Sequence, residues 1–222
     1  MRSSSKRSKT VRRTRRVPKS LGPARTMQSF TTNLRITLSG TGYESVSYML
    51  NSVTDPYQSG ATNQPRGLAE YKDFYSRAIV RSFSMTVKGV CTAGVSSVVS
   101  IGFAAGGLPS DTVAFRLTEL EHFKSRIALE GGNNVIQMST GVHQVKKVYG
   151  NRELDYTDFG QLLSGTTNPS RQIPALVSMQ SMDTSSSSTV QLIISITQMV
   201  EMFDIKAVAA VQSKTVVVLN NG

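Results

Sequence analysis

The chain has 222 residues, of which 39% are hydrophobic, and its formal net charge is +11; this size and composition fit one folded domain with a charged extension. Residues 1–25 contain ten Lys/Arg and no Asp or Glu, whereas the other 197 residues contain 15 Lys/Arg and 14 Asp/Glu. The single cysteine, Cys91, excludes an intrachain disulfide framework and is expected to be a small core or turn residue. No apolar run approaches the roughly 18 residues of a membrane span, so we expect no membrane partner.

Residues 1–27 are predicted to form a disordered arm. Ser, Thr, Arg and Lys dominate it, and Pro18 and Pro23 interrupt any helix; so many like charges with few apolar residues cannot offset the entropy of ordering. Lys and Arg on a flexible chain bind phosphates by charge and displace counterions without reading bases. The predicted nucleic-acid-binding residues are Arg2, Lys6, Arg7, Lys9, Arg12, Arg13, Arg15, Arg16, Lys19 and Arg25.

Two clusters in the arm, 6–9 and 12–16, also fit nuclear-import signals. A host nuclear import receptor is therefore a second expected partner, and the two roles are compatible in one segment. A solvated tail without a partner is the remaining alternative. A mitochondrial presequence is not favoured, because Val11, Val17 and Leu21 are too scattered to form one apolar helical face.

Residues 28–206 follow an apolar–polar alternation of period two, which predicts strands that cover a core on one side. In one run, Ile79, Phe83, Met85 and Val87 are expected on the same face. The strongest runs are 34–38, 46–50, 79–87, 95–103, 173–179 and 192–202, and weaker candidates are 126–130, 135–139, 142–148 and 214–219. Turn-forming residues separate these runs at 39–42, 106–109, 131–134 and 166–169, and 183–188 is expected to be a hairpin loop.

Residues 112–124 interrupt this pattern. Leu117, Leu120, Lys124 and Ile127 are three or four residues apart, which predicts one short helix. Eight or more short strands with one helix favour an all-β sandwich, with the eight-stranded antiparallel jelly roll as the leading candidate. The apolar tail, 207–222, would be an aggregation hazard if exposed, so it is predicted to form an extra strand or an intersubunit contact.

Several short motifs in this order resemble the coat proteins of small circular single-stranded DNA viruses, the circovirus-like group. They are Asp55-Pro56-Tyr57, Pro65-Arg66-Gly67, Tyr71, Phe74-Tyr75, Ile79-Val80-Arg81-Ser82, then Lys146-Lys147-Val148-Tyr149-Gly150 and Asn168-Pro169. Together with the basic N-terminus they span most of the chain. One departure is the absence of Trp, since these proteins often carry aromatic residues in the strand that here spans 173–180.

The resemblance implies a viral capsid protein with a jelly-roll shell domain at 28–206. About sixty copies (T=1) would form an icosahedral virion, with the arm inside on a single-stranded DNA genome. Coat proteins of small positive-strand RNA viruses share the fold and the arm, so DNA and RNA both stay open. The competing class is a monomeric β-sandwich with a basic tail that binds nucleic acid or carbohydrate.

No enzymatic activity, cofactor or metal is expected. The two histidines, His122 and His143, are predicted to be structural, the first on a helix surface and the second on a strand. No G-x-S-x-G, P-loop or G-x-G-x-x-G motif occurs, and one cysteine with two distant histidines cannot form a structural zinc site alone.

Two further clusters could form sites. Glu153, Asp155 and Asp158 provide oxygen ligands that would suit calcium between subunits, but a solvated loop is favoured. The aromatic residues at 71, 74 and 75 could stack on bases, but core and interface packing is favoured.

Overall fold

The computed structural model describes residues 25–57, 64–108, 117, 119–132, 134–164 and 168–206. Nine of the ten arm cations, the tail at 207–222 and residues 112–116 and 118 of the predicted helix at 112–124 lie outside the described residues. Within the described part, no helix is long and apolar enough to cross a membrane.

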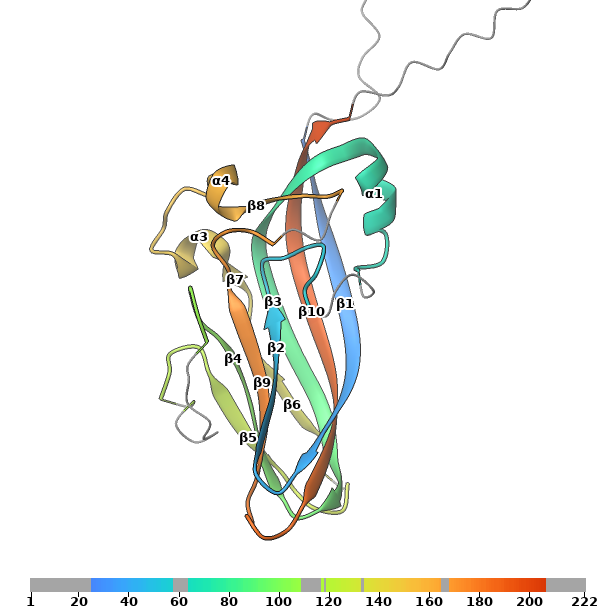
Figure 1. The fold of residues 1–222 in the computed structure, drawn as a ribbon, viewed down its shortest axis with the longest axis vertical. Helices are drawn as coiled ribbons and strands as arrows, with labels where there is room; N and C mark the ends of the chain where they lie inside the picture. The colour runs from blue at the N-terminus through green and yellow to red at the C-terminus, as the bar shows by residue number, and fades with distance from the viewer. Residues whose placement is uncertain are drawn as a thin grey trace, which may run out of the picture.

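Two antiparallel sheets face each other in an elongated sandwich (Figure 1). Sheet A has the order β1-β10-β3-β6, and the short strands β7 and β8 also pair with β3. Its strands are β1 (Arg25–Gly40), β3 (Tyr75–Gly94), β6 (Ile136–Ser139), β7 (His143–Gln144), β8 (Gly160–Leu162) and β10 (Ser188–Ile205). Sheet B has the order β2-β9-β4-β5, formed by β2 (Tyr43–Met49), β4 (Ser97–Phe103), β5 (Lys124–Ala128) and β9 (Pro174–Ser181). Eight main strands in this order form a jelly roll, which confirms the predicted fold class.

The alternating residues provide the core between the sheets. Along β10, even-numbered side chains from Val190 to Met202 are buried, whereas Ile193 and Met199 are exposed on the other face. Phe83 of β3 and Phe103 of β4 meet edge-to-face across the interior, with ring centroids 5.1 Å apart. Period-two patterning thus produces two sheets that each bury one face.

A β-bulge in sheet A corrects the face predicted for Ile79. The pairing of β3 with β10 shifts register between Met199 and Val200, so that Val80 pairs with Val200 and Ile79 pairs with Glu201. Beyond the bulge the alternation is inverted, since one extra residue changes which side chains face the core. Ile79 is buried, but on the opposite face of the sheet from Phe83.

The two ends of the sandwich differ in the length of their connections. At one end, hereafter the tip, four connections at 41–42, 95–96, 129–135 and 182–187 join strands directly (bottom of Figure 1). Gly94 at this end has a φ of 82°, and a Cβ there would lie 1.9 Å from the carbonyl oxygen of Ser187. Only glycine fits where these two turns meet.

The opposite end, hereafter the wide end, carries the longer connections and both ends of the described chain (Figure 1). Two buried amides hold it together. The Asn51 amide donates to the carbonyl of Arg171 at 2.6 Å and accepts from the amide of Ile173 at 2.8 Å. Gln198 of β10 donates to the carbonyls of Leu50 and Ser52, both at 2.8 Å. These bonds satisfy loop carbonyls that burial would otherwise leave unpaired.

The short elements depart from the sequence predictions. The structure describes three short helices where one was predicted: α1 (Leu68–Phe74), α3 (Val145–Val148) and α4 (Tyr156–Phe159). The predicted strand at 142–148 is wrong beyond Gln144, because one helical turn follows and buries Val145. In the segment 112–124, Leu117 is helical and Lys124 already belongs to β5.

Candidate nucleic-acid interface

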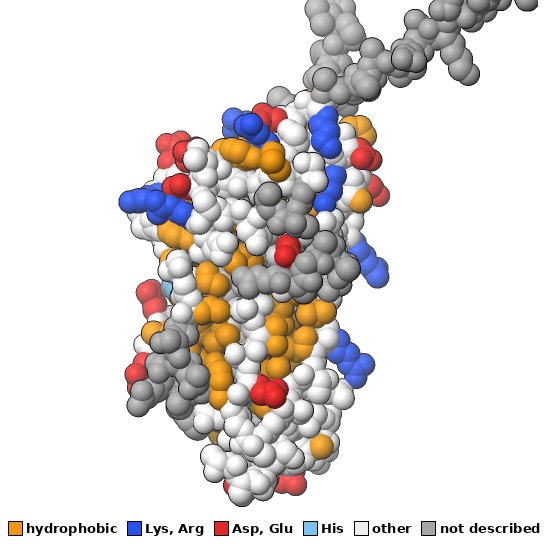
Figure 2. Space-filling view, in the orientation of Figure 1, with side chains coloured by type: hydrophobic (Ala, Val, Ile, Leu, Met, Phe, Trp, Pro, Cys, Tyr) orange, Lys and Arg blue, Asp and Glu red, His pale blue; other side chains and the backbone are white. Residues whose placement is uncertain are grey.

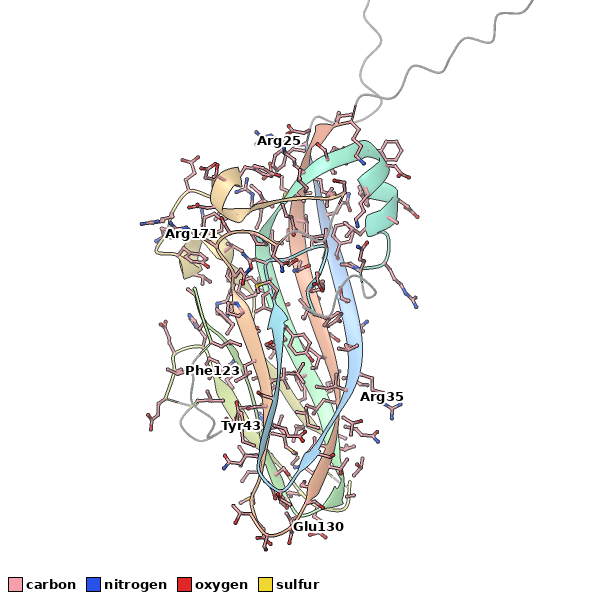
Figure 3. All side chains as sticks on the ribbon, in the orientation of Figure 1. Arg25, Arg35, Tyr43, Phe123, Glu130 and Arg171 are labelled. Carbon is pink, nitrogen blue, oxygen red and sulfur yellow. The ribbon has the colours of Figure 1, made fainter. Side chains whose placement is uncertain are left out.

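The last predicted arm cation, Arg25, is the first residue of β1, three positions before the expected start of the folded body. Its side chain is 72% exposed, and its Nη1 lies 3.2 Å from Oε1 of Glu201. The guanidinium also lies 5.9 Å from the centre of the Phe203 ring. Figure 3 shows Arg25 at the wide end of β1, where the described chain begins. The other nine predicted arm residues lie outside the described part.

The four main strands of sheet A carry more cations than acids. Their Lys/Arg residues are Arg25, Arg35, Arg77, Arg81 and Lys88, and their acids are Glu201 and Asp204. Both acids are compensated. Glu201 is only 12% exposed and accepts from Arg81 Nε at 2.6 Å as well as from Arg25, and Asp204 lies 3.1 Å from Arg77. A surplus of positive charge therefore remains on these strands.

The outer face of sheet A, meaning the side chains that point away from sheet B, is polar over its middle. Hydroxyl and amide side chains occupy successive cross-strand positions, and some bond to one another. Ser195 donates to Asn33 at 2.6 Å, and Thr31 and Thr197 share a bond of 3.0 Å. The belt comprises Ser29, Thr31, Asn33, Ser82, Ser84, Thr86, Gln137, Ser139, Ser195 and Thr197.

Two open hollows flank this polar belt. The tip-side hollow has a volume of about 500 Å³ and places Arg35 and Lys88 on either side of Ile193, which is 52% exposed. The second hollow, toward the wide end, has a volume of about 320 Å³ and is lined by Arg81, Lys146 and Met199 among others. No acid lines either hollow among the described residues. Figure 3 shows Arg35 projecting outward from β1.

The corresponding face of sheet B is covered rather than open. Leu117 and Phe123 pack on Leu176 of β9 in a second apolar cluster, with Tyr43 beside them. A Cβ on Gly102 would lie 2.3 Å from the Phe123 ring, so this aromatic side chain rests directly on the sheet backbone. Figure 2 shows side chains of several kinds, with hydrophobic strips, on the side where sheet B lies in front.

The histidines come together, which sequence spacing did not indicate. The His122 and His143 ring centroids are 5.3 Å apart, and both rings contact Phe103, at 4.4 and 4.7 Å. His143 Nε2 lies 2.8 Å from the carbonyl oxygen of Thr140. His122 occupies a turn rather than the predicted helix surface. Aromatic packing accounts for the pair, in agreement with the structural role predicted for both.

No protein-family model matches the chain, and no curated protein matches it. Among solved structures, a chain of tobacco necrosis virus superposes with a TM-score of 0.52 at 12% identity, over 84% of this chain and 85% of that one. A chain of turnip yellow mosaic virus gives 0.44 at 10% identity, over 86% and 99%. The BFDV capsid protein gives 0.38 at 7% identity, over 81% and 100%. The first of these likenesses shows a shared fold.

Two of the three candidate calcium ligands, Asp155 and Asp158, have separate partners. Asp155 accepts from the amide of Thr157 at 3.3 Å and so caps α4, and Asp158 forms an ion pair with Arg171 at 2.7 Å. The described residues contain no group of three His, Cys, Asp or Glu that could hold a metal ion. These contacts fit a loop stabilised by its own capping and ion pairing.

The aromatic cluster next to β3 is mostly packed. Tyr75 is buried, and Tyr71 meets Phe30 edge-to-face with centroids 5.8 Å apart. Phe74 is 55% exposed. The predicted core packing is therefore confirmed for Tyr71 and Tyr75, and Cys91 is likewise buried as predicted.

Proposed function

We propose that this chain is a viral capsid protein that self-assembles into a small icosahedral shell and encloses a single-stranded genome. The observation that carries the proposal is the polycationic segment that directly precedes β1 of a nearly neutral jelly roll. A basic tail alone would fit any polyanion-binding protein. A jelly roll of this strand order gives that tail a folded body suited to tiling a closed surface, in line with the resemblance of the sequence motifs to viral coat proteins.

The exposed apolar residues at the tip support contacts between copies. Leu129 follows β5 and Met182 follows β9, and both side chains are more than half exposed. Apolar side chains gathered at one end of a molecule mark an interaction surface. A closed shell would cover them through repeated heterologous contacts.

The arm would act as a space-filling polycation rather than a reader of sequence. About sixty copies would bring about 600 arm charges into one cavity, and multivalency would strengthen weak individual contacts. Arg accounts for seven of the ten cations, and its guanidinium can hold a phosphate in bidentate fashion. The folded body has room for one sandwich, which favours about sixty copies over 180.

Size-exclusion chromatography of the expressed full chain separates this proposal from a monomeric binding module. A shell of about sixty subunits elutes as a particle on the order of a megadalton, whereas the module elutes as a 24.1 kDa monomer. A purely monomeric profile across assembly conditions would overturn the proposal.

Deletion of residues 2–16 tests the role of the arm. The sandwich should fold with unchanged far-ultraviolet circular dichroism, and purified particles should lack full-length nucleic acid. Particles of the deletion variant that retain full-length genome would contradict genome binding by the arm.

The genome type and the site of assembly are separate parts of the proposal. The sequence resemblance favours single-stranded DNA, with positive-strand RNA as the alternative, and treatment of extracted nucleic acid with DNase or RNase decides between them. Assembly in the host nucleus predicts that a fluorescent protein fused to residues 1–27 accumulates there. Cytoplasmic retention of that fusion would remove the import receptor from the list of partners.

A further inference from the structure

The outer face of sheet A has a charge pattern that the arm alone does not explain. In two hollows of this face, two cations surround an exposed apolar side chain: Arg35 and Lys88 with Ile193, and Arg81 and Lys146 with Met199. Neither hollow is lined by an acid among the described residues. A row of hydroxyl and amide groups separates the two hollows.

This pattern matches the chemistry of a single-stranded nucleic acid. Its phosphates are attracted by Lys and Arg, its bases pack on apolar surfaces, and its sugars and base edges form hydrogen bonds with Ser, Thr, Asn and Gln. Free carboxylates would repel phosphates, but Glu201 and Asp204 are both ion-paired. Glu153 and Asp155 line only the neighbouring hollow at the wide end, which Arg81 also borders, and neither lines the tip-side hollow. The Arg81 guanidinium keeps further donors beyond its bond to Glu201.

The geometry links the face to the arm. Ile193 and Met199 are six residues apart on β10, which places the two hollows roughly 20 Å from each other. Arg25, where the arm joins the fold, projects from the same face of β1 as Arg35. A nucleic acid held by the arm would therefore meet this face at high effective concentration.

We propose that the outer face of sheet A is a second binding surface for the packaged single-stranded nucleic acid, with phosphates held by Arg35 and Lys88 at one hollow and by Arg81 and Lys146 at the other. The proposal rests on the proposed function, because it assigns a second contact to the same partner. The proposal also sets the orientation of each subunit in the shell: sheet A lines the cavity, and the apolar residues that cover sheet B face away from the cavity.

A second copy of the chain is the competing occupant of this face. Two copies placed face to face would bring Arg35 and Lys88 of one against the same cations of the other, and like charges across an interface are unfavourable. Nucleic acid neutralises these charges, so charge complementarity favours it.

The decisive comparison uses two double variants of the full chain with equal charge loss. R35Q/K88Q alters the tip-side hollow, and the matched control R66Q/R152Q removes two exposed cations that line neither hollow. The probes are fluorescent 20-nucleotide oligo(dT) and oligo(U). They are titrated at several salt concentrations, with the protein kept below the concentration at which particles form. The slope of log K against log salt is negative, and each lost phosphate contact on a single strand reduces its magnitude by about 0.7.

We expect R35Q/K88Q to reduce the magnitude of that slope by about 1.4 and the control to leave it unchanged. Particles of R35Q/K88Q should have the normal diameter but contain less nucleic acid than wild-type particles. Equal slopes for both variants, or an unchanged slope for R35Q/K88Q, would overturn the proposal. Loss of particle formation by R35Q/K88Q alone would also overturn it, because that result indicates a contact between copies. Failure of the proposed function is distinguishable, because the wild-type chain would then form no nucleic-acid-containing particle at all. The two oligonucleotides show whether the face prefers DNA or RNA.

Discussion

Replacing Gln198 by Met should measure how much one buried amide contributes to the wide end of the sandwich. The Gln198 side chain is only 1% exposed, and its Nε2 donates to the carbonyls of Leu50 and Ser52 at 2.8 Å. Methionine has a similar length but no donor, so both carbonyls lose this partner in the interior. An unsatisfied buried group costs about 1–3 kcal/mol, and the apolar side chain recovers part of that loss. We therefore expect a net loss of about 2–4 kcal/mol in the free energy of unfolding.

Urea unfolding of the unassembled chain, followed by far-ultraviolet circular dichroism, measures this effect. With a slope of about 2 kcal/mol per molar urea, the midpoint should fall by about 1–2 M. The control is Gln137→Met on the exposed edge strand β6, which should shift the midpoint by less than about 0.3 M. Similar shifts for the two variants would refute the inference that the two Gln198 hydrogen bonds connect the sheet to the loop after β2.

Three other perturbations have defined outcomes. Gly94→Ala forces a left-handed residue against the carbonyl of Ser187, so thermal unfolding should show a loss of about 1–3 kcal/mol, and an unchanged melting temperature would contradict that contact. Burial raises the pKa of Tyr57 to about 12, and burial with Tyr57 as a neighbour also raises the pKa of Tyr48. The stability that both hydroxyls contribute is complete below pH 10 and is lost as pH rises through the folded-state pKa values. The double Phe variant should therefore show a flatter decline in urea midpoint between pH 10 and 12 than the wild type, and parallel declines would argue against the burial effect. If the tail clamps neighbouring subunits, truncation after Asp204 should prevent assembly while leaving a folded monomer, and normal particles by light scattering would exclude the clamp.

The strands were predictable because their alternation is local. The run through Leu192, Ile194 and Ile196 specified both the strand and its buried face, and each of these side chains is buried. The short helices were not predictable, because four to seven residues are too few to establish a helical period. The inverted face of Ile79 depends on a single bulged position, which a period-two pattern cannot locate.

The candidate interface was only partly predictable for a similar reason. The arm is visible in the sequence because its ten cations are contiguous along the chain. The cations of sheet A are dispersed along the chain, and Arg35 and Lys88 line one hollow only because β1 and β3 both pair with β10. Pairing between segments more than 100 residues apart in sequence sets that arrangement, and no local pattern encodes it.

The histidine pair has the same origin. His122 lies between Leu117 and Phe123, which pack on sheet B, and His143 lies on a two-residue strand of sheet A. Their contact through Phe103 arises from the packing of the two sheets, so residue spacing could only treat them as distant.

Negative-stain electron microscopy of the purified full chain, combined with nuclease treatment of the nucleic acid that purifies with it, tests the central claim most directly. The account predicts closed particles of one diameter whose nucleic acid resists nuclease while the particles are intact and is degraded once they are opened. A protein that stays monomeric, or that forms only open aggregates whose nucleic acid is digested at once, would contradict it.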